Sequence, residues 1–271
     1  GTAQSEGALS LSLDRKYLIM TGYDADVGTK TVATSASAAV NRVIGVIDSN
    51  NAIDTSTAAD YLTGVAIRSA VSPDGKALWS SGAAGTFYTT LGSTAAPVAL
   101  NATNMRWLGF FNGQLYGSSS SAATKGINTV GTGMPKTAPA AATLLPGFIA
   151  QTTTSHYGFV GFDRDAQAGL DVFYVADDSG TAAGGGIQRW SLTAGVWKLD
   201  GTMATGLTAG CRGLMGYISG KDVVLLATTV ETTARVVSFT DDGTAIDKLP
   251  SKEIVKAGAN TAYRGISAPP Q

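Results

Sequence analysis

Short apolar runs, each followed by a turn rich in Gly, Asp or Asn, recur along the whole chain. Six of these runs share one design, and they start near Ala8, Arg68, Arg106, Gly158, Arg212 and Arg264. After each of the first five, a turn leads into a second apolar run, such as KYLIMTGYD or KDVVLLATT. The turns carry Asp-Arg-Lys, Pro-Asp-Gly, Asn-Gly or Ser-Gly-Lys, which is chemistry typical of β-hairpins. The pattern therefore predicts a hairpin at each of these repeats.

Weaker strand patterns follow the hairpins, among them NRVIGVIDS, GTFYTTLG, GIQRWSLTAG and ARVVSFTDDG. No stretch keeps a 3.6-residue apolar period between helix caps, and the Ala-rich segments TSASAAVNRV and TAPAAATLL are short. We therefore expect a fold that is nearly all β.

The repeats start between 38 and 60 residues apart. A period of about 50 residues with about four strands per unit is typical of a β-propeller blade. Through its Ser-Pro-Asp-Gly-type hairpins and its Arg-Gly-hydrophobic inner strands, the chain resembles secreted β-propeller repeat proteins, without the WD dipeptide of WD40 blades or the double glycine of kelch blades. The resemblance implies one β-propeller domain over residues 1–271. A β-sandwich or barrel is the alternative, but it would not repeat a hairpin at this spacing.

The last repeat, RGISAPP, has an inner strand and nothing after it. We therefore expect six blades, the sixth completed by strands that are not in this chain, because a buried strand needs partners for its backbone. An upstream fragment or a second chain would supply these strands, and the start GTAQSEG looks like a processed end. The alternative is a five-bladed propeller whose last strand pairs elsewhere.

Composition narrows the classes of partner. Charged residues make up 14% of the chain, against roughly 25% in an average soluble protein. The surface is therefore built mainly from Ser, Thr, Gly, Ala and Asn, which suits a secreted, extracellular or periplasmic protein. A net charge of −1 argues against nucleic acid, and no apolar run approaches the roughly 18 residues of a membrane span. The single cysteine, Cys211, has no partner for an internal disulfide.

Arginine opens four of the six inner strands, at Arg68, Arg106, Arg212 and Arg264. If these side chains converge at the mouth of a central channel, their planar donors suit a small anion such as a carboxylate, sulfate or phosphate. Alternatively, each one holds neighbouring blades in register. Tyr157 and Trp107 stand at the same strand starts and extend the candidate ligands to a glycan or a protein. We infer a binding or structural module without catalysis of its own.

A propeller enzyme, such as a lyase, isomerase or hydrolase, is the second hypothesis. His156 is the only histidine, and it lies just before an inner strand, on the expected face of the Arg set. A general base near neutral pH is most often His, so His156 would act together with Arg106 and Arg212. No G-x-S-x-G motif marks a serine nucleophile. The sequence therefore favours binding over catalysis.

The segment DRDAQAGLD carries Asp163, Asp165, Gln167 and Asp171. Alternating oxygen side chains on a turn resemble the start of a calcium loop. However, Ala168 occupies the usual glycine position and no Glu closes the loop. The stretch also lies where the other repeats have an ordinary hairpin turn. Calcium is therefore the one cofactor that the sequence suggests, and no other is expected.

Overall fold

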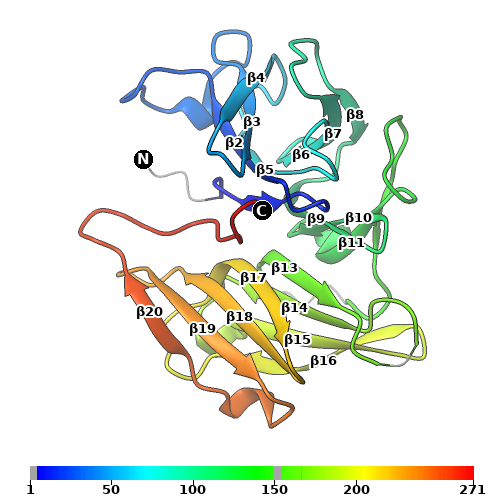
Figure 1. Ribbon diagram of the computed structural model, residues 1–271, viewed down its shortest axis with the longest axis vertical. Coiled ribbons are helices and arrows are strands. Elements are labelled where there is room, and N and C mark those ends of the chain that lie inside the picture. Colours follow the sequence, from blue (N-terminus) through cyan, green and yellow to red (C-terminus); the bar gives the residue numbers. More distant parts are fainter. Residues whose placement is uncertain (1–4, 149–153, 166) are drawn as a thin grey trace. The chain divides into compact units, whose positions relative to one another are not determined.

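The chain is an all-β β-propeller with five blades. The computed structural model describes residues 5–148, 154–165 and 167–271, and these contain five four-stranded sheets (Figure 1). In each sheet four consecutive strands pair in chain order, which is the arrangement of propeller blades. The first sheet comprises β1 (Leu9–Leu11), β2 (Tyr17–Tyr23), β3 (Arg42–Asp48) and β4 (Ile53–Ala59). The second comprises β5 (Ile67–Val71), β6 (Ala77–Gly82), β7 (Gly85–Thr90) and β8 (Val98–Asn101). The third comprises β9 (Met105–Phe111), β10 (Gln114–Ser119), β11 (Gly126–Val130) and β12 (Ala142–Leu144).

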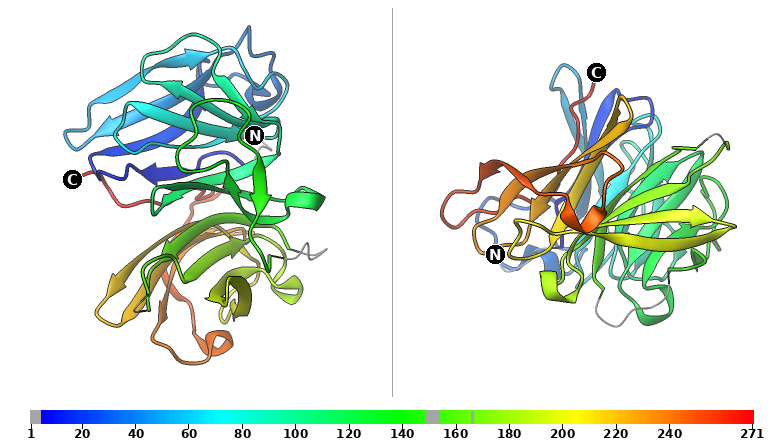
Figure 2. Two further views of the ribbon diagram at one scale, coloured as in Figure 1. Left: turned by 90° about the vertical axis from the view of Figure 1, so that its right-hand side faces the viewer. Right: turned by 90° about the horizontal axis from the view of Figure 1, so that it is seen from below.

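The last two sheets carry the site described below, and Figure 2 shows them from two further directions. The fourth sheet comprises β13 (His156–Phe162), β14 (Val172–Asp177), β15 (Gly186–Thr193) and β16 (Val196–Met203). The fifth comprises β17 (Cys211–Ser219), β18 (Asp222–Thr229), β19 (Arg235–Asp241) and β20 (Lys252–Lys256). The helices of the described residues are single 3-10 turns: η1 (Val32–Thr34), η2 (Ala122–Thr124), η3 (Thr181–Ala183) and η4 (Ile246–Lys248). None of them has the length and apolar character that a membrane span needs.

The six-blade prediction is wrong, and the five-blade alternative is right. The segment expected to be a sixth inner strand forms no strand. The carbonyl oxygen of Arg264 accepts a hydrogen bond from the Thr228 hydroxyl at 2.7 Å, so a side chain and not a strand satisfies it. Pro269 and Pro270 follow, and neither has an N–H group to offer to a sheet. A second chain or an upstream fragment stays a prediction as a partner, but with five blades it has no sixth blade to complete.

The predicted hairpin turns are confirmed where the backbone requires them. Asn112 and Gly113, between β9 and β10, have φ angles of 47° and 71°. Two successive positive φ angles define the type I′ turn, whose twist matches that of the flanking strands. Gly75, in the Ser-Pro-Asp-Gly turn between β5 and β6, has a φ of 74°. An L side chain is disfavoured at such angles, which accounts for glycine at these positions.

The described residues fall into two compact units. The first includes residues up to 117, together with 129–143 and 267–271; the second includes 118–128 and 144–266. In the second unit, the apolar faces of β14, β15, β17, β18 and β19 form one buried cluster. It includes Tyr174, Ile187, Leu214, Leu225, Val237 and Phe239. Two clusters of the same kind hold the first unit, one around Ile19, Ile67 and Leu78 and the other around Trp79, Met105 and Leu115.

The C-terminal residues 267–271 belong to the first unit. The backbone N–H of Gln271 donates to the carbonyl of Arg15 at 2.8 Å, and Nε of Arg15 donates to the Gln271 side chain at 3.0 Å. Arg15 lies in the turn between β1 and β2, so the chain end lies beside the first hairpin.

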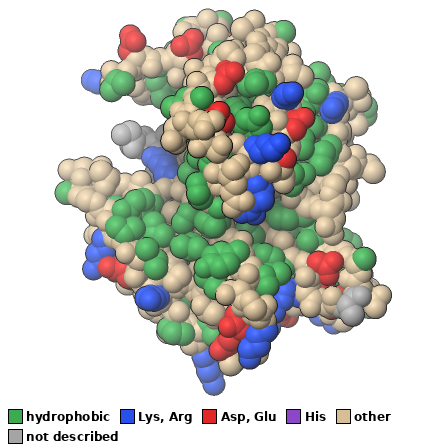
Figure 3. Space-filling model, viewed as in Figure 1, with side chains coloured by type: hydrophobic (Ala, Val, Ile, Leu, Met, Phe, Trp, Pro, Cys, Tyr) green, Lys and Arg blue, Asp and Glu red, His purple; other side chains and the backbone are tan. Residues whose placement is uncertain are grey.

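Uncharged atoms cover most of the face drawn in Figure 3, with Lys, Arg, Asp and Glu side chains in scattered groups. This agrees with the low charged fraction of the sequence. Specific polar groups, and not a broad charged surface, therefore have to provide any selective binding.

Candidate functional site

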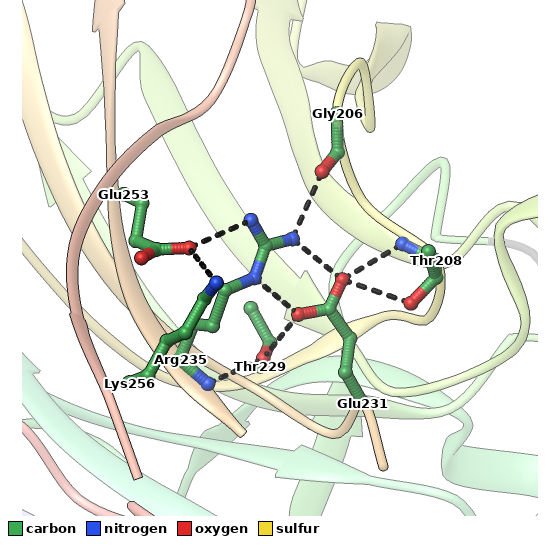
Figure 4. Close-up of polar contacts among 7 residues, drawn as sticks. All are labelled: Gly206, Thr208, Thr229, Glu231, Arg235, Glu253 and Lys256. Carbon is green, nitrogen blue, oxygen red and sulfur yellow. Dashed lines mark hydrogen bonds and ion pairs between the residues drawn. The ribbon is translucent and has the colours of Figure 1, made fainter. Parts of the chain in front are cut away.

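Polar side chains of the second unit gather at one end of its two sheets. This end, called the loop end below, is where β13 and β17 begin and where β14, β18 and β20 end. Because consecutive strands of each sheet are antiparallel, the segments before the inner strands and after the second strands meet there. His156, Arg212 and the cavity shown in Figure 4 all lie at the loop end.

Arg68, Tyr157 and Arg212 occupy equivalent places in three blades. In each inner strand the register with the second strand shifts just after the first residue: between Ile67 and Ser69, between His156 and Phe159, and between Cys211 and Leu214. Such β-bulges change the direction in which a side chain points. Two of the four recurring arginines, Arg68 and Arg212, thus stand at an irregularity of the inner strand.

Arg212 is held by two neighbours from the preceding blade. Its guanidinium lies over the ring of Tyr157, with Cζ 4.6 Å from the ring centroid. Nε donates to the carboxylate of Asp178 at 3.1 Å, and Nη2 also donates to it. The Arg212 side chain is 16% exposed and that of Asp178 12%. The Arg212 cation, between an aromatic ring and a carboxylate, joins β17 to the fourth blade. This is the alternative role given for the Arg set, in which each arginine holds neighbouring blades in register.

Of the other three arginines of the set, Arg68 also bonds to a neighbouring blade. In the first unit, Nη1 of Arg68 donates to the Asn104 side chain and, at 3.1 Å, to the carbonyl of Met105, at the start of the next blade. Arg106 and Arg264 are half-buried. Since two of the four residues belong to each unit, their convergence at one channel mouth stays a prediction.

His156 lies in a buried polar network. Its Nε2 donates to Oε1 of Gln188 at 2.9 Å, and Trp190 Nε1 donates to the same oxygen at 3.0 Å. Asp177, opposite His156 in the sheet, accepts from Gln188 at 3.3 Å and from the backbone N–H of Ser155 at 2.8 Å. The His156 side chain is 3% exposed and that of Asp177 is fully buried. A general base has to reach its substrate, so this placement favours a structural role for the ring.

The tryptophans are core residues. Trp107 is 6% exposed, so its indole offers no open face on which a sugar ring would stack. Trp190 stacks on Phe148 with a centroid distance of 4.1 Å, and Trp197 packs against Phe173 at 4.7 Å. Trp190 and Trp197 therefore pack against other aromatic side chains. Aromatic stacking of a ligand would have to use other rings.

The carboxylates of the proposed calcium loop accept backbone hydrogen bonds within the turn. Asp171 accepts from the N–H of Arg164 at 2.8 Å, Asp165 from Gln167 at 2.7 Å and Asp163 from Gly169 at 3.1 Å. Residue 166 lies outside the described residues. Among the residues that the structure describes, no three His, Cys, Asp or Glu side chains are placed to hold a metal ion. Calcium binding stays a prediction.

A polar cavity at the loop end was not predicted from the sequence. It has a volume of about 420 Å³ and is lined by Gly206, Thr208, Glu231, Thr232, Thr233, Arg235, Glu253 and Lys256. These residues come from the segment before β17, the turn between β18 and β19, and strand β20. The only signal in the sequence is the turn TTVETTAR, where Glu and Arg flank a run of threonines.

An ion pair organises the cavity (Figure 4). Arg235 donates from Nε and Nη2 to the two oxygens of Glu231, each at 2.6 Å. Nη2 also donates to the carbonyl of Gly206 at 2.9 Å, and Nη1 lies 3.5 Å from a carboxylate oxygen of Glu253. This two-pronged geometry is the strongest form of ion pair available to arginine. The guanidinium is thus fixed between two acidic side chains.

Glu231 has further donors around it. The backbone N–H and hydroxyl of Thr208 donate to Oε1 at 2.8 and 3.0 Å, and the Thr229 hydroxyl donates to Oε2 at 2.9 Å. Burial opposes the charged form, but the hydrogen bonds from Arg235, Thr208 and Thr229 outweigh it and lower the pKa of Glu231 to about 2. The hydrogen bond and the charge of Glu231, with a further contribution from Glu253, outweigh burial and raise the pKa of Arg235. Both groups are therefore charged throughout the physiological range.

The rim of the cavity keeps polar groups available to a ligand. Thr232, Thr233 and Lys256 are exposed. Within the described part of the chain, Lys256 Nζ has one charged neighbour, a Glu253 oxygen 3.6 Å away, and the other Glu253 oxygen has no protein donor. The cavity therefore presents an ammonium group, a carboxylate oxygen and two hydroxyls around a fixed ion pair.

Comparison with known proteins bears on the fold. No protein-family model and no curated protein matches the sequence. The structure is similar to a protein from Bacteroides uniformis assigned as a 6-phosphogluconolactonase, with a TM-score of 0.54 and 10% identity over 92% of this chain and 70% of that one. At this identity the likeness shows the β-propeller fold alone.

Two further solved structures have lower scores. An α-L-arabinofuranosidase from Clostridium thermocellum has a TM-score of 0.47 at 12% identity, over 93% of each chain. BamB from Moraxella catarrhalis has a TM-score of 0.43 at 13% identity, over 98% of this chain and 87% of that one.

Proposed function

We propose that this chain is an extracytoplasmic β-propeller binding module that takes a neutral glycan in the cavity around Arg235 and Glu231. The charge-poor surface, rich in Ser and Thr, supports the proposed location. The proposal narrows the ligand classes that the sequence suggests, a small anion, a glycan or a protein, to the second of them.

The charge balance of the cavity carries this choice. Its lining includes two cations, Arg235 and Lys256, and two anions, Glu231 and Glu253. A small anion would gain attraction from one pair and repulsion from the other, so the net charge of the lining does not favour it. A neutral molecule with several hydroxyl groups meets both donors and acceptors. Sugar hydroxyls donate to a carboxylate and accept from an ammonium group or a threonine hydroxyl.

Size and lining also indicate the expected affinity. A volume of about 420 Å³ lies within the range of small-molecule sites, roughly 300–1,000 Å³, and accommodates one or two sugar rings. Among the described residues that line the cavity there is no aromatic ring. Hydrogen bonds made in exchange for water bonds give little net free energy, so we expect a dissociation constant of about 1 mM.

The test is a screen of neutral oligosaccharides followed by saturation-transfer NMR on the full chain. We expect saturable transfer to at least one neutral glycan, with no comparable transfer to sialylated or sulfated glycans. The proposal is wrong if no neutral glycan binds at millimolar concentration, or if binding is confined to acidic glycans.

A further inference from the structure

A second cavity of the same unit lies at the opposite end of the sheets from the loop end. It has a volume of about 200 Å³ and is lined by Arg164, Val172, Tyr174, Arg189, Ser191, Asp241 and Gly243. Arg164 follows β13, Val172 begins β14 and Asp241 ends β19, so the cavity lies between the fourth and fifth blades. It shares no residue with the cavity around Arg235 and Glu231.

Two carboxylates fix the guanidinium of Arg189. Nε donates to Asp200 at 2.8 Å, and Nη1 donates to Asp241 at 2.9 Å. Within the residues that the structure describes, Nη2 of Arg189 has no hydrogen-bond acceptor. The side chain is thus held in one orientation, with part of its donor set left for a ligand.

Asp241 does not compete for these remaining donors. One of its oxygens accepts from Arg189 and, at 2.6 Å, from the hydroxyl of Tyr174, and the other accepts from the backbone N–H of Gly243 at 3.0 Å. Burial raises the pKa of Asp241, but these hydrogen bonds outweigh it and lower the pKa below its usual value. Asp241 is therefore a fixed, fully engaged anion at the back of the cavity.

Arg164 supplies the second cation. It is exposed, its backbone N–H is anchored by Asp171, and Nη2 donates to the carbonyl of Lys221 at 2.6 Å. Nε and Nη1 of Arg164 have no acceptor among the described residues. Two arginines with unused donors therefore line one small cavity, opposite a half-buried aliphatic side chain, Val172.

We propose that this cavity binds a short-chain monocarboxylate. The lining carries two arginines and one aspartate, and Asp200, which accepts from Arg189 Nε, offsets the remaining positive charge. The unused donors of the two arginines, and not a net charge, therefore favour a single carboxylate. The oxygens of the carboxylate accept from Arg189 Nη2 and from Arg164, and a short alkyl group packs on Val172. A dianion would be opposed by Asp241.

Titration of the full chain with sodium propionate tests the proposal, with propionamide as a neutral ligand of the same shape and sodium chloride at matched ionic strength. Binding is followed by the NMR signals of the arginine side chains. We expect propionate to shift the signals of Arg164 and Arg189 saturably, and propionamide and chloride to leave them in place. Equal shifts with propionamide would overturn the proposal, as would propionate shifts that do not saturate.

The variant is Arg164→Gln, and the matched control is Arg15→Gln, which removes an exposed arginine from the first unit. Losing charged hydrogen bonds to the ligand should weaken propionate binding about tenfold in Arg164→Gln and leave it unchanged in Arg15→Gln. Unchanged binding in Arg164→Gln would overturn the proposal. This outcome is independent of glycan binding, since the two cavities share no residue.

Discussion

Arg235 and Glu231 face each other across the turn between β18 and β19 and join through two hydrogen bonds of 2.6 Å (Figure 4). The Glu231 side chain is 5% exposed and that of Arg235 17%. The pair ties the turn to the segment before β17, through Thr208 and Gly206. It shapes the cavity at the loop end, so its removal has consequences for both stability and binding.

Glu231→Gln should destabilise the fold by about 2 kcal/mol, because it leaves the guanidinium without its closest counter-charge and places an amide NH₂ among donors. Glu253→Gln is the matched control, since Glu253 touches the same guanidinium at 3.5 Å but is 39% exposed. The control should cost less than about 0.5 kcal/mol. Urea unfolding, followed by tryptophan fluorescence, measures both. Equal losses in the two variants would contradict this description of the pair.

The pH dependence of stability should report the same residue. The pKa of Glu231 is lowered in the folded state from an ordinary value of 4.5 to about 2. Its stabilising contribution is therefore complete above about pH 5 and is lost as the pH falls towards 2. The free energy of unfolding of the wild type should fall over this range, and that of Glu231→Gln should fall less steeply. If the free energy of unfolding falls equally steeply with pH in the two proteins, Glu231 has the same pKa in the folded and the unfolded state, which contradicts the prediction.

Gly213→Ala should destabilise the second unit by about 1–3 kcal/mol. A Cβ atom there would collide with the carbonyl oxygen of Arg264 and lie 2.8 Å from the Thr228 hydroxyl. Gly22→Ala is the control, since a Cβ at this strand glycine meets nothing within 4 Å. Limited proteolysis with mass spectrometry should show faster cleavage around residues 257–266 in Gly213→Ala only. Equal cleavage in the two variants would argue against close packing of Arg264 on β17.

Arg212→Ala should lower the free energy of unfolding by about 1–2 kcal/mol, because it removes the contact with the Tyr157 ring and the ion pair with Asp178. Tyr157→Phe keeps the aromatic ring under the guanidinium and the ion pair, and should cost less than Arg212→Ala. Thermal melting of the three proteins measures the effect. If Arg212→Ala melts like the wild type, Arg212 does not hold the fourth and fifth blades together, and its ligand role gains weight.

The sequence predicts the inner three strands of most blades because their apolar residues face a core. It misses the fourth strands, such as β4 and β20, because they carry polar residues at the blade edge; every residue of β20 is exposed. Pairing with the third strand, and not an apolar pattern, defines these edge strands. The segment after Tyr263 looked like an inner strand by its first residues, but its prolines and its side-chain partners prevent it.

The candidate site was harder to predict than the fold. Of the recurring Arg residues, Arg212 lies at the loop end and is paired with Asp178, and a ligand role for the set stays a prediction. What the sequence could not supply is how close distant residues come: Thr208 lies 23 positions from Glu231 in the sequence, yet its N–H and hydroxyl both reach the Glu231 carboxylate. Likewise, nothing in the segment around His156 indicates that Gln188 encloses it.

The measurement that tests the proposed function most directly is the dissociation constant of the best neutral glycan for the wild type, Lys256→Ala and Lys252→Ala. Both lysines are exposed on β20, but only Lys256 lines the cavity. We predict binding about fivefold to tenfold weaker in Lys256→Ala, from the loss of one charged hydrogen bond, and wild-type binding in Lys252→Ala. Equal affinity in all three proteins would contradict binding in the cavity around Arg235 and Glu231.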